Sequence, residues 1–139
     1  MDSYKFVFRG KTYELSKDNC SYLINDEENE VKGIEISDVL ELLNQYEGAN
    51  FDLEYYNQPC EKCFYGKEEK LKHFNFLEYH FYVFTKEDKY IISNISKEYE
   101  NTSFTRLLNL GKVDNSYIVI IMVCENCGAY SIEIEQCDM

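Results

Sequence analysis

Four of the six cysteines in this 139-residue chain form two pairs with the same spacing. Two residues separate Cys60 from Cys63, and two separate Cys124 from Cys127. A turn of that length can aim two thiolates at one point, and two such turns supply the four sulfur ligands of a tetrahedral zinc ion. The spacing therefore predicts a metal site, with structural zinc as the preferred occupant. Iron remains an alternative, because all-sulfur tetrahedral sites also hold iron.

Other interpretations of the cysteines stay open. A redox dithiol of the thioredoxin kind follows a strand and opens a helix, and neither pair has that context. Cysteines can also be small buried thiols without a common role, which is our expectation for Cys20 and Cys137. Cys137 is an alternative ligand, ten positions after the second pair. His73 and His80 lack a partner at the spacing of a mixed Cys and His site.

The sequence contains none of the common catalytic motifs. It has no G-x-S-x-G, no phosphate-binding glycine loop, no G-x-G-x-x-G and no H-E-x-x-H. A catalytic zinc needs an open coordination position, whereas four thiolates close the coordination shell. We therefore expect no catalytic residues and a protein that is not an enzyme.

Strand-like segments flank both cysteine pairs. Residues 51–57 and the aromatic-rich residues 74–84 lie on either side of the first pair, and residues 117–123 and 130–135 enclose the second. Alternation of apolar and polar residues is the signature of a strand with one buried face. Each pair is therefore predicted to form the tip of a hairpin.

The remaining segments predict an α+β fold with a mostly antiparallel sheet and one or two short helices. Residues 4–15 read as a hairpin, 20–25 as a third strand and 104–110 as a short helix. Helical spacing of apolar residues over 36–46 predicts a longer helix, capped by Ser37 and stopped by Gly48. Residues 117–123 are apolar throughout, which predicts a central strand that is covered on both faces.

Two hairpin tips that share one metal resemble the zinc-ribbon family. The second pair matches its knuckle best, because Gly128 follows Cys127 and glycine permits the left-handed backbone that turns N–H groups toward sulfur. The first pair departs from the pattern, since Phe64 follows Cys63 and the glycine is delayed to Gly66. The length predicts a single domain, 1–139, with an N-terminal hairpin and helix in 1–50. The resemblance implies a zinc-ribbon-like sheet in 51–139.

Residues 51–56 (Phe-Asp-Leu-Glu-Tyr-Tyr), together with Cys124-Glu-Asn-Cys-Gly128, are also similar to an uncharacterised family of small acidic bacterial proteins. That similarity covers the whole chain. It implies no assigned activity.

The charge of the chain limits its partners. The formal net charge is −12, which disfavours a nucleic acid as a ligand. Only Lys62, Lys67, Lys70 and Lys72 form a locally basic stretch. Neither a signal peptide nor an apolar run long enough to span a bilayer is visible, which predicts a cytoplasmic protein with reduced thiols and no membrane contact. The leading hypothesis is a metal-stabilised protein-interaction module of unknown oligomeric state. The alternative is a thiol-redox or metal-handling protein that uses the same cysteine pairs.

Overall fold

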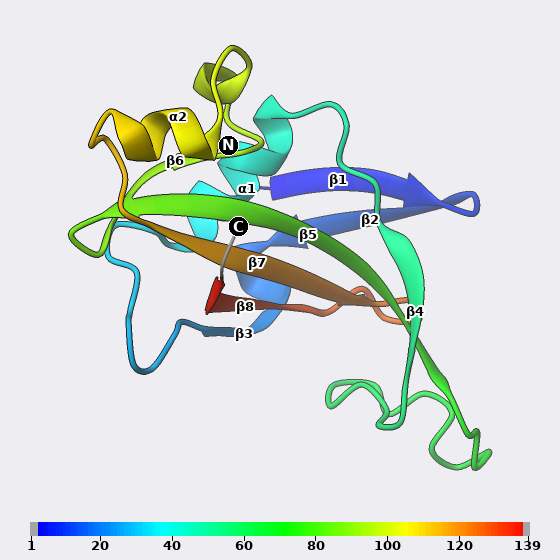
Figure 1. Ribbon diagram of the computed structural model, residues 1–139. Helices are drawn as coiled ribbons and strands as arrows, with labels where there is room; N and C mark the ends of the chain where they lie inside the picture. Colours follow the sequence, from blue (N-terminus) through cyan, green and yellow to red (C-terminus); the bar gives the residue numbers. More distant parts are fainter. Residues whose placement is uncertain (1–2, 138–139) are drawn as a thin grey trace.

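The computed structural model describes residues 3–137 of the chain (Figure 1). Two short 3₁₀ turns, Lys17–Asn19 and Lys97–Tyr99, accompany the longer elements. In chain order those elements are β1 (Ser3–Phe8), β2 (Lys11–Ser16), β3 (Cys20–Ile24), α1 (Ile36–Gln45), β4 (Asp52–Tyr56), β5 (Phe74–Lys86), β6 (Lys89–Ser93), α2 (Phe104–Asn109), β7 (Asn115–Cys124) and β8 (Tyr130–Cys137).

The main sheet has six strands in the order β3-β8-β7-β5-β4, with β6 also paired to β5. The long β5 strand pairs with β7 along one edge, while β4 and then β6 share its other edge. All these pairings are antiparallel except that of β3 with β8, which is parallel. The prediction of an α+β fold with a mostly antiparallel sheet is thus confirmed, and the one parallel pairing makes the sheet a mixed one. The alternation of residues fixes the face that a strand buries, and it carries no information on the direction of its neighbour.

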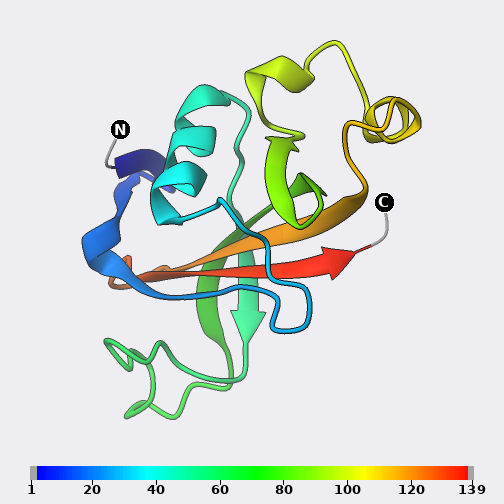
Figure 2. The same cartoon turned by 90° about the vertical axis from the view of Figure 1, so that its left-hand side faces the viewer.

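The hydrophobic core lies between one face of this sheet and a second layer made of α1 and the β1–β2 hairpin. Figure 2 shows this layer on one side of the sheet and α2 toward the other side. Side chains at alternate positions of β7 enter the core, and Tyr117, Val119, Ile121 and Val123 are fully buried. We call this face of the main sheet the inner face.

The opposite face, called here the outer face, is only partly covered. At one end the segment around α2 packs on it, where Phe84, Leu107 and Val113 form a small second core. Further along β7, Ile118, Ile120 and Met122 remain partly exposed. The prediction that this strand is central is confirmed, but the prediction that both of its faces are covered is wrong.

Three local predictions also need correction. Helix α1 begins after Glu35 and not after Ser37, because the Asp38 side chain accepts a hydrogen bond of 2.8 Å from the Glu35 backbone N–H. The helix ends at Gln45, so Gly48 is not its stop. Tyr55 is 63% exposed, although the alternation in β4 predicts a buried residue there. β4 is the edge strand of the sheet, and Tyr55 lies next to its last residue, where the sheet has a strand on one side only.

Candidate metal centre

The two cysteine pairs occupy different local settings at the same end of the main sheet. Cys124 is the last residue of β7, and Cys127 lies in the tight turn that leads to β8. The first pair lies in a long connection, residues 57–73, that joins the antiparallel strands β4 and β5 and extends from the sheet at the lower right of Figure 1. Phe76 of β5 pairs with Cys124 of β7, which brings the base of this connection beside the second pair.

The four predicted ligands Cys60, Cys63, Cys124 and Cys127 come together, and their sulfur atoms all lie within 4.8 Å of one another. The Sγ atoms of Cys60 and Cys127 are 3.7 Å apart, and so are those of Cys63 and Cys124. Four sulfurs at about 2.3 Å from a central zinc are separated by tetrahedral edges of about 3.8 Å. Both contacts connect one pair with the other, so the spacing is that of a single four-sulfur site.

The two knuckles have the same backbone conformation. The residue after each pair has a positive φ, 52° at Phe64 and 81° at Gly128. Each also donates its N–H to the carbonyl of the first cysteine, at 2.9 Å for Phe64 to Cys60 and 3.0 Å for Gly128 to Cys124. The first pair thus departs from the zinc-ribbon pattern in sequence while adopting the same turn. Phe64 sustains a left-handed conformation that is unfavourable for a residue with a side chain.

Hydrogen-bond donors surround the sulfur atoms, as expected for groups that carry negative charge. The distances are long, as is usual for weak sulfur acceptors. The contacts to sulfur are Lys62 N to Cys60 at 3.4 Å, Asn126 Nδ2 to Cys63 at 3.5 Å and Ala129 N to Cys127 at 3.5 Å.

The protonation of the thiols is uneven. Burial raises the pKa of Cys63, but hydrogen bonds from the Asn126 side chain and the Tyr65 backbone outweigh it and bring this pKa to about 7. Burial raises the pKa of Cys124 and of Cys127 above the ordinary thiol value. Four thiolates in this space require a cation to offset their mutual repulsion, and a divalent metal supplies that charge.

The N-terminal hairpin holds the second knuckle in place. Lys11 Nζ donates to the carbonyl oxygens of Glu125, at 3.1 Å, and Asn126, at 2.7 Å. The buried Tyr13 donates its hydroxyl to the same Glu125 carbonyl at 2.8 Å. Sequence reasoning missed these positioning residues, because nothing in a hairpin at residues 4–15 indicates a partner more than 100 positions away.

The other residues considered as ligands lie outside the cluster. Cys20 begins β3 and donates its thiol to a backbone carbonyl, and Cys137 ends β8. His73 contacts the ring of Tyr55, with centroids 6.0 Å apart. His80 is on the outer face, and its Nε2 lies 2.6 Å from a carboxylate oxygen of Glu78.

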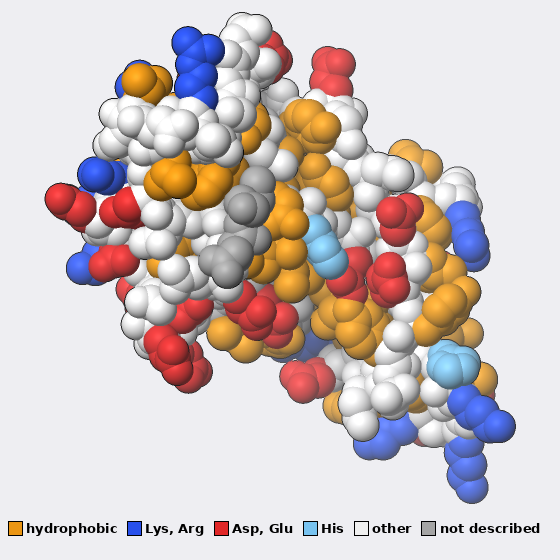
Figure 3. Space-filling model, viewed as in Figure 1, with side chains coloured by type: hydrophobic (Ala, Val, Ile, Leu, Met, Phe, Trp, Pro, Cys, Tyr) orange, Lys and Arg blue, Asp and Glu red, His pale blue; other side chains and the backbone are white. Residues whose placement is uncertain are grey.

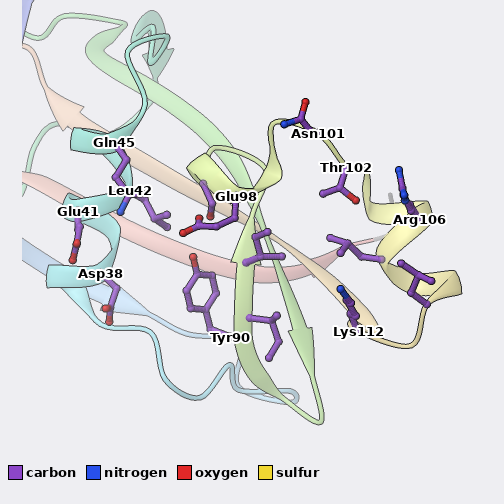
Figure 4. Close-up of a pocket in the computed structure, with 15 residues that line it drawn as sticks. Asp38, Glu41, Leu42, Gln45, Tyr90, Glu98, Asn101, Thr102, Arg106 and Lys112 are labelled. Atoms are coloured by element: carbon purple, nitrogen blue, oxygen red, sulfur yellow. The ribbon is translucent and has the colours of Figure 1, made fainter.

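A hollow of about 720 Å³ lies away from the cysteines, between α1, β6 and the α2 segment. Figure 4 shows Asp38 and Glu41 of α1 on one side of Tyr90, Glu98 near the hydroxyl-bearing end of its ring, and Arg106 and Lys112 across the hollow. Its walls thus carry opposite charges. No cysteine or histidine lines it.

No helix within residues 3–137 is both long enough and apolar enough to cross a membrane.

The comparisons with known proteins assign a family but no activity. No curated protein and no solved structure matches the chain. The family that matches is not a zinc-ribbon family, so the likeness to zinc ribbons is limited to the cysteine knuckles. A sequence profile described as "Protein of unknown function (DUF3785)" matches residues 4–139, in agreement with the predicted similarity to an uncharacterised family. The chain therefore belongs to this family of proteins of unknown function.

Proposed function

We propose that the four cysteines bind one structural zinc ion and that the domain so stabilised acts by binding another protein. The observation that carries the metal assignment is the 3.7 Å spacing between sulfurs of opposite pairs, which matches the edge of a tetrahedral zinc–thiolate site. Four protein ligands leave no open position for a substrate or an activated water.

The connection between β4 and β5 explains why a metal is needed. Backbone hydrogen bonds within residues 64–71 join Lys67 to Phe64, Lys70 to Lys67 and Leu71 to Gly66, so they stay inside the connection. The sulfur contacts tie this segment to the β7–β8 turn. A metal ion there is a cross-link between a long connection and the sheet, and closing such a loop in the folded state stabilises it.

The same geometry disfavours the redox alternative. A reactive dithiol would form its disulfide within one C-x2-C pair, but the 3.7 Å contacts join cysteines of different pairs. Iron in place of zinc would use the same four ligands. The two metals differ in colour, because iron–thiolate centres absorb visible light and zinc centres do not.

Metal analysis of the purified protein tests the assignment. We expect about one zinc per chain, with thiols that resist alkylation until a chelator is added. Cys60→Ser and Cys124→Ser should each lose the metal and lower the unfolding free energy. The matched control is Cys20→Ser, which removes a thiol outside the cluster and should keep one zinc.

Three results would contradict the proposal. They are a metal-free protein of unchanged stability, a coloured iron-loaded protein, and equal metal loss in the Cys20 control.

The protein-binding role is supported by surface composition. Large hydrophobic side chains such as Tyr22, Ile24, Tyr55 and Phe64 are exposed, and aromatic residues are enriched at protein interfaces. Nucleic acid is disfavoured as the partner by the net charge of −12, and this stays a prediction.

A further inference from the structure

The outer face of the main sheet carries a partly exposed apolar strip. Residues directly opposite in an antiparallel pair share a face, so Ile118, Ile120 and Met122 lie on the same side as Tyr82, His80 and Glu78. The edge strand β3 carries Tyr22 and Ile24 on the same face, 37% and 44% exposed, but β8 lies between them and β7. We define the outer strip as the three apolar residues of β7 on this face: Ile118, Ile120 and Met122.

Acidic side chains lie on both sides of the outer strip. Glu133 and Glu135 of β8 flank it on one side, and Asp52, Glu54 and Glu78 flank it on the other. The outward-facing residues of β3, β8, β7 and β4 that lie in register with residues 76–82 of β5 form one continuous area. None of them is Lys or Arg. Figure 3 views this face and shows a central hydrophobic band with red acidic groups around it and most blue basic groups at the periphery.

Within the described part of the chain, no Lys or Arg forms an ion pair with any of these carboxylates. The ion pairs there are Lys5 with Glu14 and the contact between His80 and Glu78. The Glu78 side chain is nine-tenths buried, and its Oε2 atom has no hydrogen-bond partner. A carboxylate oxygen buried without a partner is unfavourable, and an added cationic group would offset this cost.

A hollow of about 370 Å³ continues the outer strip toward the metal centre. Residues 57–61 of the first knuckle form one wall, and Tyr22, Phe76 and Met122 lie opposite. The hollow is large enough for one bulky apolar side chain, so it can anchor a ligand that lies along the strip.

We propose that the outer face docks a cationic amphipathic helix of a partner protein, with its apolar side on the outer strip and its Lys or Arg side chains against the flanking carboxylates. The outer face is about 20 Å long along the strands, from Phe76 to Tyr82, and about 19 Å wide across them, from β3 to β4. A helix of about 13 residues covers that length. The inference rests on the proposed protein-binding role and names the partner class that the charges and the apolar strip select.

The probe is a fluorescent 14-residue peptide in which leucines form one helical face and lysines border it. Binding to the full chain is followed by anisotropy at low and at physiological salt. We expect saturable binding that weakens with salt, because the flanking contacts are between exposed charges. The same peptide with glutamate in place of lysine should not bind.

Two matched pairs of variants locate the contact. Ile120→Lys places a positive charge in the outer strip and should weaken binding at least tenfold, whereas Val7→Lys places it on the exposed side of β1 and should not. The double variant E133Q/E135Q removes the two outer-face charges of β8 and should weaken binding about tenfold.

The control double variant E41Q/E47Q removes the same charge from exposed positions at and just after α1, on the opposite side of the sheet. Because the net charge changes equally, this control should leave binding within about twofold.

Equal losses in both members of either pair would overturn the proposal, because the peptide would then bind only through overall charge. A wild-type dimer that dissociates in the Ile120→Lys variant would also overturn it, since a second copy would occupy the face. Zinc content is measured on the same samples. A zinc-free protein that still discriminates between the variants would refute the metal assignment and leave the docking face standing.

Discussion

Replacing Gly128 by alanine should lower the unfolding free energy of the metal-loaded protein by about 1 kcal/mol, at the lower end of the left-handed penalty for a residue with a side chain. Gly128 has a φ of +81°, and a side chain at that angle clashes with the backbone. Space is not the obstacle, because an added Cβ would meet only the Cδ1 atom of Tyr13, at 3.9 Å. Phe64 already holds the corresponding conformation in the first knuckle. The variant should therefore keep its zinc.

Urea denaturation of the zinc-loaded proteins measures this cost, and metal analysis of the same samples measures zinc retention. Gly33→Ala is the matched control, since Gly33 has a φ of +82° and nothing within 4 Å of an added Cβ. It lies in the loop between β3 and α1, away from the cysteines. The two variants should lose similar amounts of stability, because the same backbone strain acts in both.

Different outcomes would refute the reasoning in identifiable ways. A loss above about 3 kcal/mol at Gly128 alone would mean that the knuckle tolerates no Cβ, contrary to the spacing from Tyr13. No loss at either position would mean that the backbone angles are not left-handed. Loss of zinc in the Gly128 variant would break the parallel with Phe64.

Three further predictions address the support of the site and the core. Tyr13→Phe removes the hydroxyl that donates to the Glu125 carbonyl and should cost about 1 kcal/mol in urea denaturation; a cost near zero would show that the hairpin does not hold the knuckle. Ile121→Ala, at a fully buried position of β7, should cost about 2–5 kcal/mol, and a cost below 1 kcal/mol would contradict the packing. Backbone N–H donors, that of Gln136 first, hold the pKa of the Asp26 carboxyl below its usual value. The ionised Asp26 carboxylate therefore stabilises the folded state at pH values above its unfolded-state pKa. This stabilisation is lost as the pH falls through its folded-state pKa. The stability difference between wild type and Asp26→Asn should shrink on acidification, and a constant difference from pH 6 to pH 3 would contradict this.

Much of the fold could be predicted from residue patterns. The aromatic-rich segment at 74–84 and the alternation of Tyr130, Ile132 and Ile134 both correspond to strands, and the apolar residues of β8 are buried. The four-cysteine cluster follows from spacing alone, because two C-x2-C turns have few other uses in one chain. These features follow from residue patterns within short segments, so they can be predicted from one sequence.

The features that were missed depend on distant neighbours. The parallel pairing of β3 with β8 joins residues more than 100 positions apart, and no local pattern encodes it. The run at 117–123 is apolar on both faces, so its composition does not reveal that Ile118 and Ile120 stay uncovered. The conformation of Phe64 was also hidden, since its side chain predicts no left-handed turn.

The pairing of β3 with β8 has a consequence for synthesis of the chain. β3 is complete by residue 24, but its partner positions are Tyr130 to Glu133, and the central β7 strand begins only at Asn115. A nascent chain of about 110 residues would hold β5 without its β7 neighbour and β3 without its β8 neighbour. The sheet cannot close until residues 130–137 have left the ribosome, because β8 joins β3 to β7 through non-local contacts. Such topologies fold slowly and expose aggregation-prone strands meanwhile, so the interval before residues 130–137 emerge is a vulnerable stage for this fold.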